Sequence, residues 1–182
     1  AADVANEFRR TGSYRWPVTS GNAYARWFIA PLMPMQPPQS QDGILNTLAP
    51  LYGEIVTAPE PLGEYRVHGR SVSRGRVTAA RVGYPDFARR IAIRHAEFAV
   101  LQEHAQMMNV RLPAGDPLDR EIVFVNYRLM ARKMRESYEQ HERDSNLRLA
   151  WLGLQLAWRG AHPLRVRLAH TAWFCALLLC PA

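Results

Sequence analysis

The apolar residues beyond residue 76 recur at helical spacing, and this pattern constrains the fold more than any other feature of the chain. Steps of three, four and seven residues place side chains on one face of an α-helix. The first such stripe consists of Phe87, Ile91, Phe98, Leu101, Ala105 and Met108. We predict a long helix here, with this stripe buried in a core.

Two more helical segments are predicted downstream. Asp116 and Pro117 form a favourable helix start, an N-cap followed by proline at the first helical position, and we expect this helix to continue to about His141. A further apolar stripe ends before Gly160 and consists of Leu147, Trp151, Leu154 and Trp158. We interpret the tryptophans and Phe98 as core residues.

The residues before 76 have a different character. They are rich in proline, glycine and aromatic side chains with short apolar runs, which is typical of strands and turns. Short strands are predicted at 16–19, 54–58 and 64–68, and helices at 23–32 and from Asp42 to Gly53. This order predicts an α/β fold with too few strands for a complete sheet, followed by an α-helical extension.

The last segment, residues 164–180, is apolar apart from Arg165, Arg167 and His170. Its uncharged part is shorter than the roughly 20 apolar residues that a membrane span requires. Three interpretations remain open: a helix docked on the body, an interfacial helix, or a truncated transmembrane helix. The two arginines would suit the cytoplasmic flank of such a span.

The charge of the chain makes acidic partners plausible. The net charge is +7 and the pI is near 10.0, which suits a nucleotide diphosphate, an anionic lipid surface or nucleic acid. Lys133 is the only lysine among 23 basic residues. Arginine suits phosphate recognition, although such a bias more often reflects a GC-rich genome. Cys175 and Cys180 are interpreted as apolar filler.

Three segments carry a family resemblance. They read PVTSGNAYAR at 17–26, continuing to PLMPM at 31–35, then DGILNTLAPLYG at 42–53, and EPLGEYRVHG at 60–69. In this order and spacing they resemble the second half of the catalytic domain of family 2 glycosyltransferases, which have the GT-A fold. The resemblance covers about residues 8–75.

The resemblance implies an inverting transfer of a sugar from a nucleotide-diphosphate donor to a saccharide or lipid-linked acceptor. It divides the chain into an incomplete GT-A-like half-domain (1–75), a helical extension (76–162) and a hydrophobic terminal helix (163–182). Such enzymes hold a divalent metal, Mg²⁺ or Mn²⁺, on an Asp-X-Asp motif of the N-terminal, nucleotide-binding half. No Asp-X-Asp occurs in this sequence, so we expect the chain to be a fragment that is inactive alone.

The resemblance also implies roles for individual residues. Asp42 matches the aspartate that takes the proton from the acceptor hydroxyl; the alternative is a plain helix cap, and Gln41 stands where relatives often have an acidic residue. Ser20, Gly21 and Asn22 match the turn that approaches donor sugar and acceptor. For this turn too, a plain helix cap is the alternative.

His68 matches a histidine that relatives place near the diphosphate or its metal, and a lone histidine is otherwise most often structural. Arg66 and Arg70 flank it in a basic, Gly/Ser-rich loop that also contains Arg74 and Arg76. Such a loop suits closure over a diphosphate, and the alternative is a solvated connector.

A different class of function also fits the composition. The chain would then be a basic helical interaction module that binds a membrane surface or nucleic acid. It lacks the aromatic-and-basic pattern of a known nucleic-acid fold, so no nucleic-acid partner is expected, whereas a membrane surface stays among the expected partners. We expect a cytoplasmic location, with the inner face of the plasma membrane as the candidate site.

Overall fold

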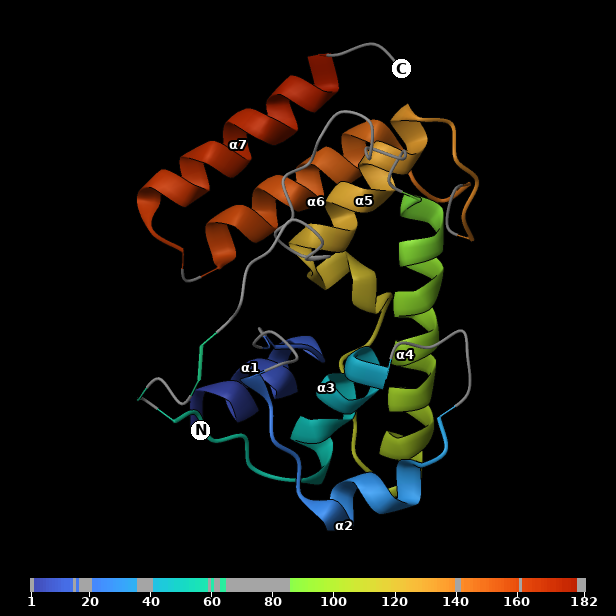
Figure 1. The fold of residues 1–182 in the computed structure, drawn as a ribbon. Helices are drawn as coiled ribbons and strands as arrows, with labels where there is room; N and C mark the ends of the chain where they lie inside the picture. The colour runs from blue at the N-terminus through green and yellow to red at the C-terminus, as the bar shows by residue number, and fades with distance from the viewer. Residues whose placement is uncertain are drawn as a thin grey trace.

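The computed structural model of the chain is built from helices alone in the part that it describes (Figure 1). It describes residues 2–14, 16, 21–35, 41–58, 60, 63–64, 86–139, 142–160 and 162–179. No strand or sheet is present among these residues. The predicted α/β fold with an incomplete GT-A-like half-domain is therefore wrong.

Seven α-helices and two 3-10 turns make up this described part. In chain order they are α1 (Ala2–Thr11), α2 (Arg26–Ile29), η2 (Ala30–Leu32), α3 (Gln41–Tyr52), α4 (Phe87–Met107), η4 (Pro117–Arg120), α5 (Ile122–Lys133), α6 (Asn146–Arg159) and α7 (Leu164–Leu179). None of these helices is long and apolar enough to cross a lipid bilayer.

The predicted strand at 54–58 shows why the α/β interpretation fails. Its backbone is irregular, and all of its side chains are exposed except the half-buried Ile55. A strand is stable only when a neighbouring strand pairs its N–H and C=O groups, and the described residues offer no such neighbour. Trp16 also lies outside any strand. Residues 17–19 and 65–68, from the other two predicted strands, lie outside the described residues.

The helix predicted from Asp42 to Gly53 is confirmed as α3. Its apolar positions Ile44, Leu45 and Leu48 are buried as their spacing indicates. The Gly53 N–H donates to the Ala49 carbonyl at 3.1 Å and closes the helix. The predicted helix at 23–32 is shorter than expected, because α2 begins only at Arg26.

The long helix predicted beyond residue 76 is confirmed as α4, which runs the length of one side of the molecule (Figure 1). Asp86 caps it by accepting a hydrogen bond from the Arg89 N–H at 2.8 Å. Its stripe is buried as predicted, apart from the exposed Met108 at the helix end. Both α3 and α5 pack against α4.

The helix predicted from Asp116 to about His141 is interrupted and ends early. Asp116 does cap a helical turn, since its carboxylate accepts from the Leu118 N–H at 2.9 Å, but that turn is η4. The main helix, α5, ends at Lys133. Arg135 then takes a left-handed conformation with φ of 59°, which terminates α-helices.

Two groups of buried side chains form the interior. The first joins α1, α2, α3, α4 and η4 and contains Phe8, Phe28, Ile44, Leu48, Phe87, Ile91, Phe98, Leu101 and Leu118. The second joins α5, α6 and α7 and contains Val125, Leu129, Leu149, Ala150, Phe174 and Leu177. Ala131 belongs to the first group, so α5 contributes to both. The predicted domain boundary at 75/76 lies outside the described residues and stays a prediction.

α6 and α7 form the predicted helical end of the chain, and α7 lies along α6 (Figure 1). Ser145 caps α6 by accepting from the Arg148 N–H at 3.1 Å. The apolar stripe that we interpreted as core on α6 is mostly exposed: Leu147, Trp151 and Trp158 are 73%, 63% and 48% exposed, whereas Leu154 is half-buried and packs on the second group. The core interpretation is wrong for these tryptophans, because α6 buries the face that carries Leu149, Ala150, Gly153 and Ala157 instead.

Candidate functional site

The segment before α2 is tied to α3 by a small polar network. The Asn22 amide donates to the Tyr24 hydroxyl and to the Asn46 side-chain oxygen, each at 3.2 Å. The Tyr24 hydroxyl in turn donates to the same Asn46 oxygen at 3.0 Å. Asn46 is only 4% exposed, so it is a fixed acceptor around which the other two side chains are arranged.

Asn22 is therefore not a helix cap. The residue at the N-cap of α2 is Ala25, and no side chain caps that helix. The Asn22 side chain is directed to α3 instead, 24 residues along the chain. Gly21 is exposed with open space around its Cα, and Ser20 lies outside the described residues. Of the three residues of the predicted turn, Asn22 is therefore the one whose side-chain hydrogen bonds are defined.

Asp42 lies close to this network. It is exposed and belongs to the first turn of α3, and it precedes Asn46 by four residues, which places both on one face of the helix. Burial raises the pKa of the Tyr24 phenol, the hydrogen bond from Asn22 opposes that rise, and the negative charge of Asp42 adds to it. Asp42 thus lies near enough to Tyr24 for its charge to act on the phenol, while Asn22 donates directly to that hydroxyl.

An arginine fixes the helix behind this network. Arg94 of α4 is buried and donates to the Thr47 hydroxyl at 2.6 Å, one residue beyond Asn46. It also pairs with Glu97 at 2.8 Å and Glu121 at 2.6 Å. With its charge balanced by two carboxylates, Arg94 holds α3 in position rather than offering a free cation to a ligand.

Tyr14 borders the same region from the N-terminal side. Burial raises the pKa of its phenol to about 12, the nearby Tyr24 adds to the rise, and Arg94 opposes it. Trp16, two residues on, lies against the Arg94 guanidinium at 4.6 Å from the ring centroid. The network therefore has an aromatic border on one side and an exposed carboxylate, Asp42, on the other.

This arrangement suits the binding of hydroxyl groups. An exposed carboxylate accepts a proton or a hydrogen bond, and amide and phenol groups both donate and accept. We define the acceptor-side cluster as Asp42, Asn46, Tyr24 and Asn22. Sequence reasoning missed Tyr24 and Asn46. The signal for Asn46 was its four-residue spacing from Asp42, and Tyr24 stands inside the segment that carries the resemblance.

The predicted diphosphate and metal residues are not among those that the structure places. Arg66, His68 and Arg70 lie outside the described residues. Among those that it does place, no three His, Cys, Asp or Glu side chains group closely enough to hold a metal ion. The described residues therefore provide no cluster that fits the implied Mg²⁺ or Mn²⁺. The metal role of His68 stays a prediction.

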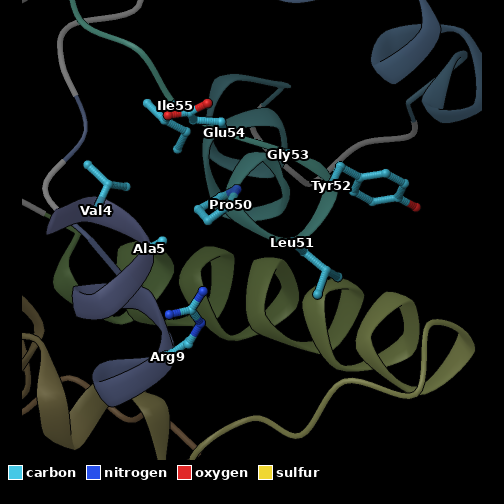
Figure 2. A pocket seen from close by; sticks show the side chains of 9 residues that line it. All are labelled: Val4, Ala5, Arg9, Pro50, Leu51, Tyr52, Gly53, Glu54 and Ile55. Atoms are coloured by element: carbon cyan, nitrogen blue, oxygen red, sulfur yellow. The ribbon is translucent and has the colours of Figure 1, made fainter. Parts of the chain in front are cut away.

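An open pocket of about 430 Å³ lies at the other end of α3 (Figure 2). Its lining residues come from α1 and from the end of α3 with the chain that follows: Val4, Ala5, Arg9, Pro50, Leu51, Tyr52, Gly53, Glu54 and Ile55. Asp42 precedes Pro50 by eight residues, which is about 12 Å along a helix. The pocket is therefore separate from the acceptor-side cluster and contains none of the predicted site residues.

The polar side chains of this pocket are partly engaged elsewhere. Arg9 donates to the Asn6 side chain at 3.0 Å. The Tyr52 hydroxyl forms a 2.5 Å hydrogen bond with the His104 ring of α4, and its ring points away from Val4 and Ala5 in Figure 2. The pocket is left without converging polar groups, which a specific small-molecule site usually has.

Comparison with known proteins finds no relative of this chain. No family model matches the sequence, and neither the curated proteins nor the solved structures give a significant match. The glycosyltransferase resemblance therefore rests on the three sequence segments alone.

Proposed function

We propose that this chain forms the acceptor side of an inverting, nucleotide-sugar-dependent glycosyltransferase. One observation supports the proposal: Asn22 is hydrogen-bonded to Tyr24 and Asn46, and Asp42, from a separate segment of the resemblance, lies one helical turn before Asn46 and acts on Tyr24 through its charge. The proposal rests on α3 and on the segment before α2, and it involves no sheet.

In the proposed reaction Asp42 acts as the general base. Its carboxylate accepts the proton of an acceptor hydroxyl while that oxygen forms a bond to the anomeric carbon of the donor sugar. The bond from this carbon to the nucleotide diphosphate breaks, and its electron pair leaves with the diphosphate. Asn22 and Tyr24 would orient neighbouring sugar hydroxyls by hydrogen bonds.

Asp42 is suited to this task by its position. It is exposed, so an acceptor can reach it, and it stands in the first turn of α3, four residues before Asn46. The partly buried Tyr24 and Asn46 beside it are held by mutual hydrogen bonds. Rigid neighbours of this kind limit the positions that a bound hydroxyl can take.

The donor side must come from residues outside this sequence, because it contains no Asp-X-Asp. We therefore test the protein that contains this chain together with its nucleotide-binding part. The assay measures release of nucleoside diphosphate from UDP-, GDP- and dTDP-sugars with Mg²⁺ or Mn²⁺ and a mixture of saccharide and lipid-linked acceptors. Wild-type protein is expected to release diphosphate from at least one donor.

Asp42→Asn is the decisive variant. It should lower transfer at least about 100-fold, the usual contribution of a general base, and leave the affinity for the nucleotide unchanged. Asp86→Asn is the matched control, since Asp86 is also exposed at a helix start and asparagine caps equally well. No diphosphate release from any donor, or full transfer by Asp42→Asn, would refute the proposal.

A further inference from the structure

From Thr171 to Leu179, beyond Arg165, Arg167 and His170, α7 is apolar around its whole circumference, yet only one side of the helix is packed. Phe174 and Leu177 are buried against α5 and α6. The opposite side shows Leu164, Leu168 and Leu179 at 63%, 52% and 86% exposure. These three follow steps of four and eleven residues and so form one row along the helix. A helix that is apolar all round is normally covered on all sides.

α6 presents a second exposed apolar row. Leu147, Trp151 and Trp158 follow steps of four and seven residues and lie on one face of the helix. The face that packs inward carries Leu149, Ala150, Gly153 and Ala157. Both tryptophans of α6 therefore point to solvent, and Gly153 allows the Phe174 ring of α7 to approach closely.

The two rows adjoin each other. The Trp158 indole N–H donates to the Thr171 hydroxyl of α7 at 3.1 Å. Thr171 is three residues from Leu168, so it is the neighbour of the α7 row on the helix surface. We call the combined patch the outer apolar surface: Leu147, Trp151 and Trp158 of α6 with Leu164, Leu168 and Leu179 of α7.

The segment that forms this surface carries charge of one sign. Residues 145–182 contain no Asp or Glu and four arginines, namely Arg148, Arg159, Arg165 and Arg167. Arg167 folds back on the turn between the helices and donates to the carbonyls of His162 at 2.9 Å and Gly160 at 3.2 Å. Arg159 and Arg165 are exposed near the same turn.

We infer that the outer apolar surface docks on an anionic lipid bilayer, with α6 and α7 lying in the interface rather than crossing it. The combination of exposed tryptophan and leucine with arginine and no acidic residue is that of an interfacial helix. Negative lipid headgroups would meet Arg159 and Arg165. A second copy of the chain is a poorer partner for this surface. Its own residues 145–182 would bring further arginines and no carboxylate to pair with them. This inference is independent of the sugar chemistry.

The experiment is vesicle flotation with the purified chain. We expect binding to phosphatidylcholine vesicles that contain phosphatidylglycerol, weak binding to pure phosphatidylcholine, and release from the anionic vesicles by high salt or alkaline carbonate. Trp151→Gln with Leu168→Gln should weaken binding to anionic vesicles at least about tenfold. Arg159→Gln with Arg165→Gln should weaken it about fivefold for each charge removed.

Trp27→Gln is the matched control. Trp27 is 64% exposed like Trp151 but lies on α2, at the opposite end of the molecule from α7 (Figure 1). Its replacement should leave vesicle binding unchanged, and circular dichroism checks that every variant keeps its helices. Equal binding by Trp27→Gln and Trp151→Gln/Leu168→Gln would overturn the inference, as would no binding by the wild-type chain. A dimer in light scattering that Trp151→Gln dissociates would assign the surface to a second copy instead.

Discussion

At the scale of single residues, Arg128 has the most demanding environment. It is fully buried and donates to both Asp144 oxygens, at 2.7 and 2.5 Å, and to Asp119 at 2.7 Å. The Tyr138 hydroxyl also donates to Asp144 at 2.9 Å, and Arg148 forms an ion pair with Asp144 at 2.8 Å. Burial opposes the charge of Arg128, but these carboxylates outweigh it and raise the arginine pKa. The network fixes the loop before α6 on α5.

Removing one partner of this network should be costly. Asp144→Asn leaves the buried Arg128 charge without its main counter-ion, so we expect a loss of about 3 kcal/mol in the free energy of unfolding. Urea unfolding followed by circular dichroism measures it. Glu139→Gln is the control, because Glu139 is exposed in the same loop and its change should cost less than about 0.5 kcal/mol. Equal urea midpoints for the two variants would contradict the prediction.

Tyr14 predicts how stability responds to alkaline pH. Burial, with a contribution from Tyr24, raises the pKa of its phenol from 10.0 to about 12 in the folded chain. Between these values the unfolded chain has lost the proton that the folded chain still binds, so stability falls as the pH rises. Tyr14→Phe removes this term.

The measurement is the urea midpoint at several pH values from neutral to about 12. The Tyr14→Phe midpoint should fall less steeply above pH 10.0 than that of the wild type. A residual fall is expected in both proteins, because burial and the neighbouring Asp144 also raise the pKa of Tyr138. Identical slopes would show that Tyr14 ionises as an ordinary exposed phenol.

At the scale of the elements, the packing of α7 on α6 depends on Gly153. A Cβ added there would overlap the Phe174 ring, which is itself buried. Alanine would gain about 1 kcal/mol in helix propensity over glycine, but overpacking in a core costs about 1–3 kcal/mol. We therefore expect Gly153→Ala to lower the free energy of unfolding by about 1 kcal/mol.

A double-variant cycle isolates the contact between the helices. Phe174→Leu removes the ring that an alanine at position 153 would meet, at the cost of lost apolar contact. In the combined variant Gly153→Ala should no longer destabilise, so the two changes should be less than additive. Urea unfolding of the four proteins decides the point. Strict additivity would place the cost of alanine elsewhere.

The helices were more predictable from the sequence than their surroundings. Apolar residues in the sequence located α3, α4, α6 and α7. A helix pairs its backbone N–H and C=O groups within itself, so its buried face appears in the sequence as a local apolar pattern. The strand at 54–58 was predicted from local composition alone, whereas a strand requires a partner that no local pattern reveals. Spacing led us to place the tryptophan face of α6 in the core, although the opposite face, with Leu149, Ala150, Gly153 and Ala157, follows helical steps equally well.

The candidate site was predictable only in part for a related reason. Asp42 and Asn22 came from the resemblance, but their proximity depends on how the loop before α2 packs on α3. Tyr24 and Asn46 join them through side-chain hydrogen bonds between distant positions. Such pairings depend on tertiary structure, so a single sequence does not record them.

At the scale of the whole molecule, the net charge of +7 is unevenly available to partners. Arg94 and Arg128 are buried in ion pairs with carboxylates, so they contribute to the fold and present no charge to solvent. Arg159 and Arg165 are exposed beside the outer apolar surface. Other exposed arginines, such as Arg26 and Arg89, lie elsewhere on the molecule. Those of α6 and α7 differ from them in belonging to a segment, residues 145–182, that contains no Asp or Glu.

The order of packing in space also follows the order along the chain. α3 packs on α4, α4 on α5, α5 on α6 and α6 on α7, so most helices find their partner in the next one synthesised. Contacts between near neighbours require little loop closure, and chains of this kind fold on the fast side for their length. A polypeptide leaving the ribosome could therefore assemble α4 to α7 one helix at a time. The apolar α7 would then pack on α5 and α6 after those helices have folded. This order shortens the time during which α7 is exposed and could aggregate.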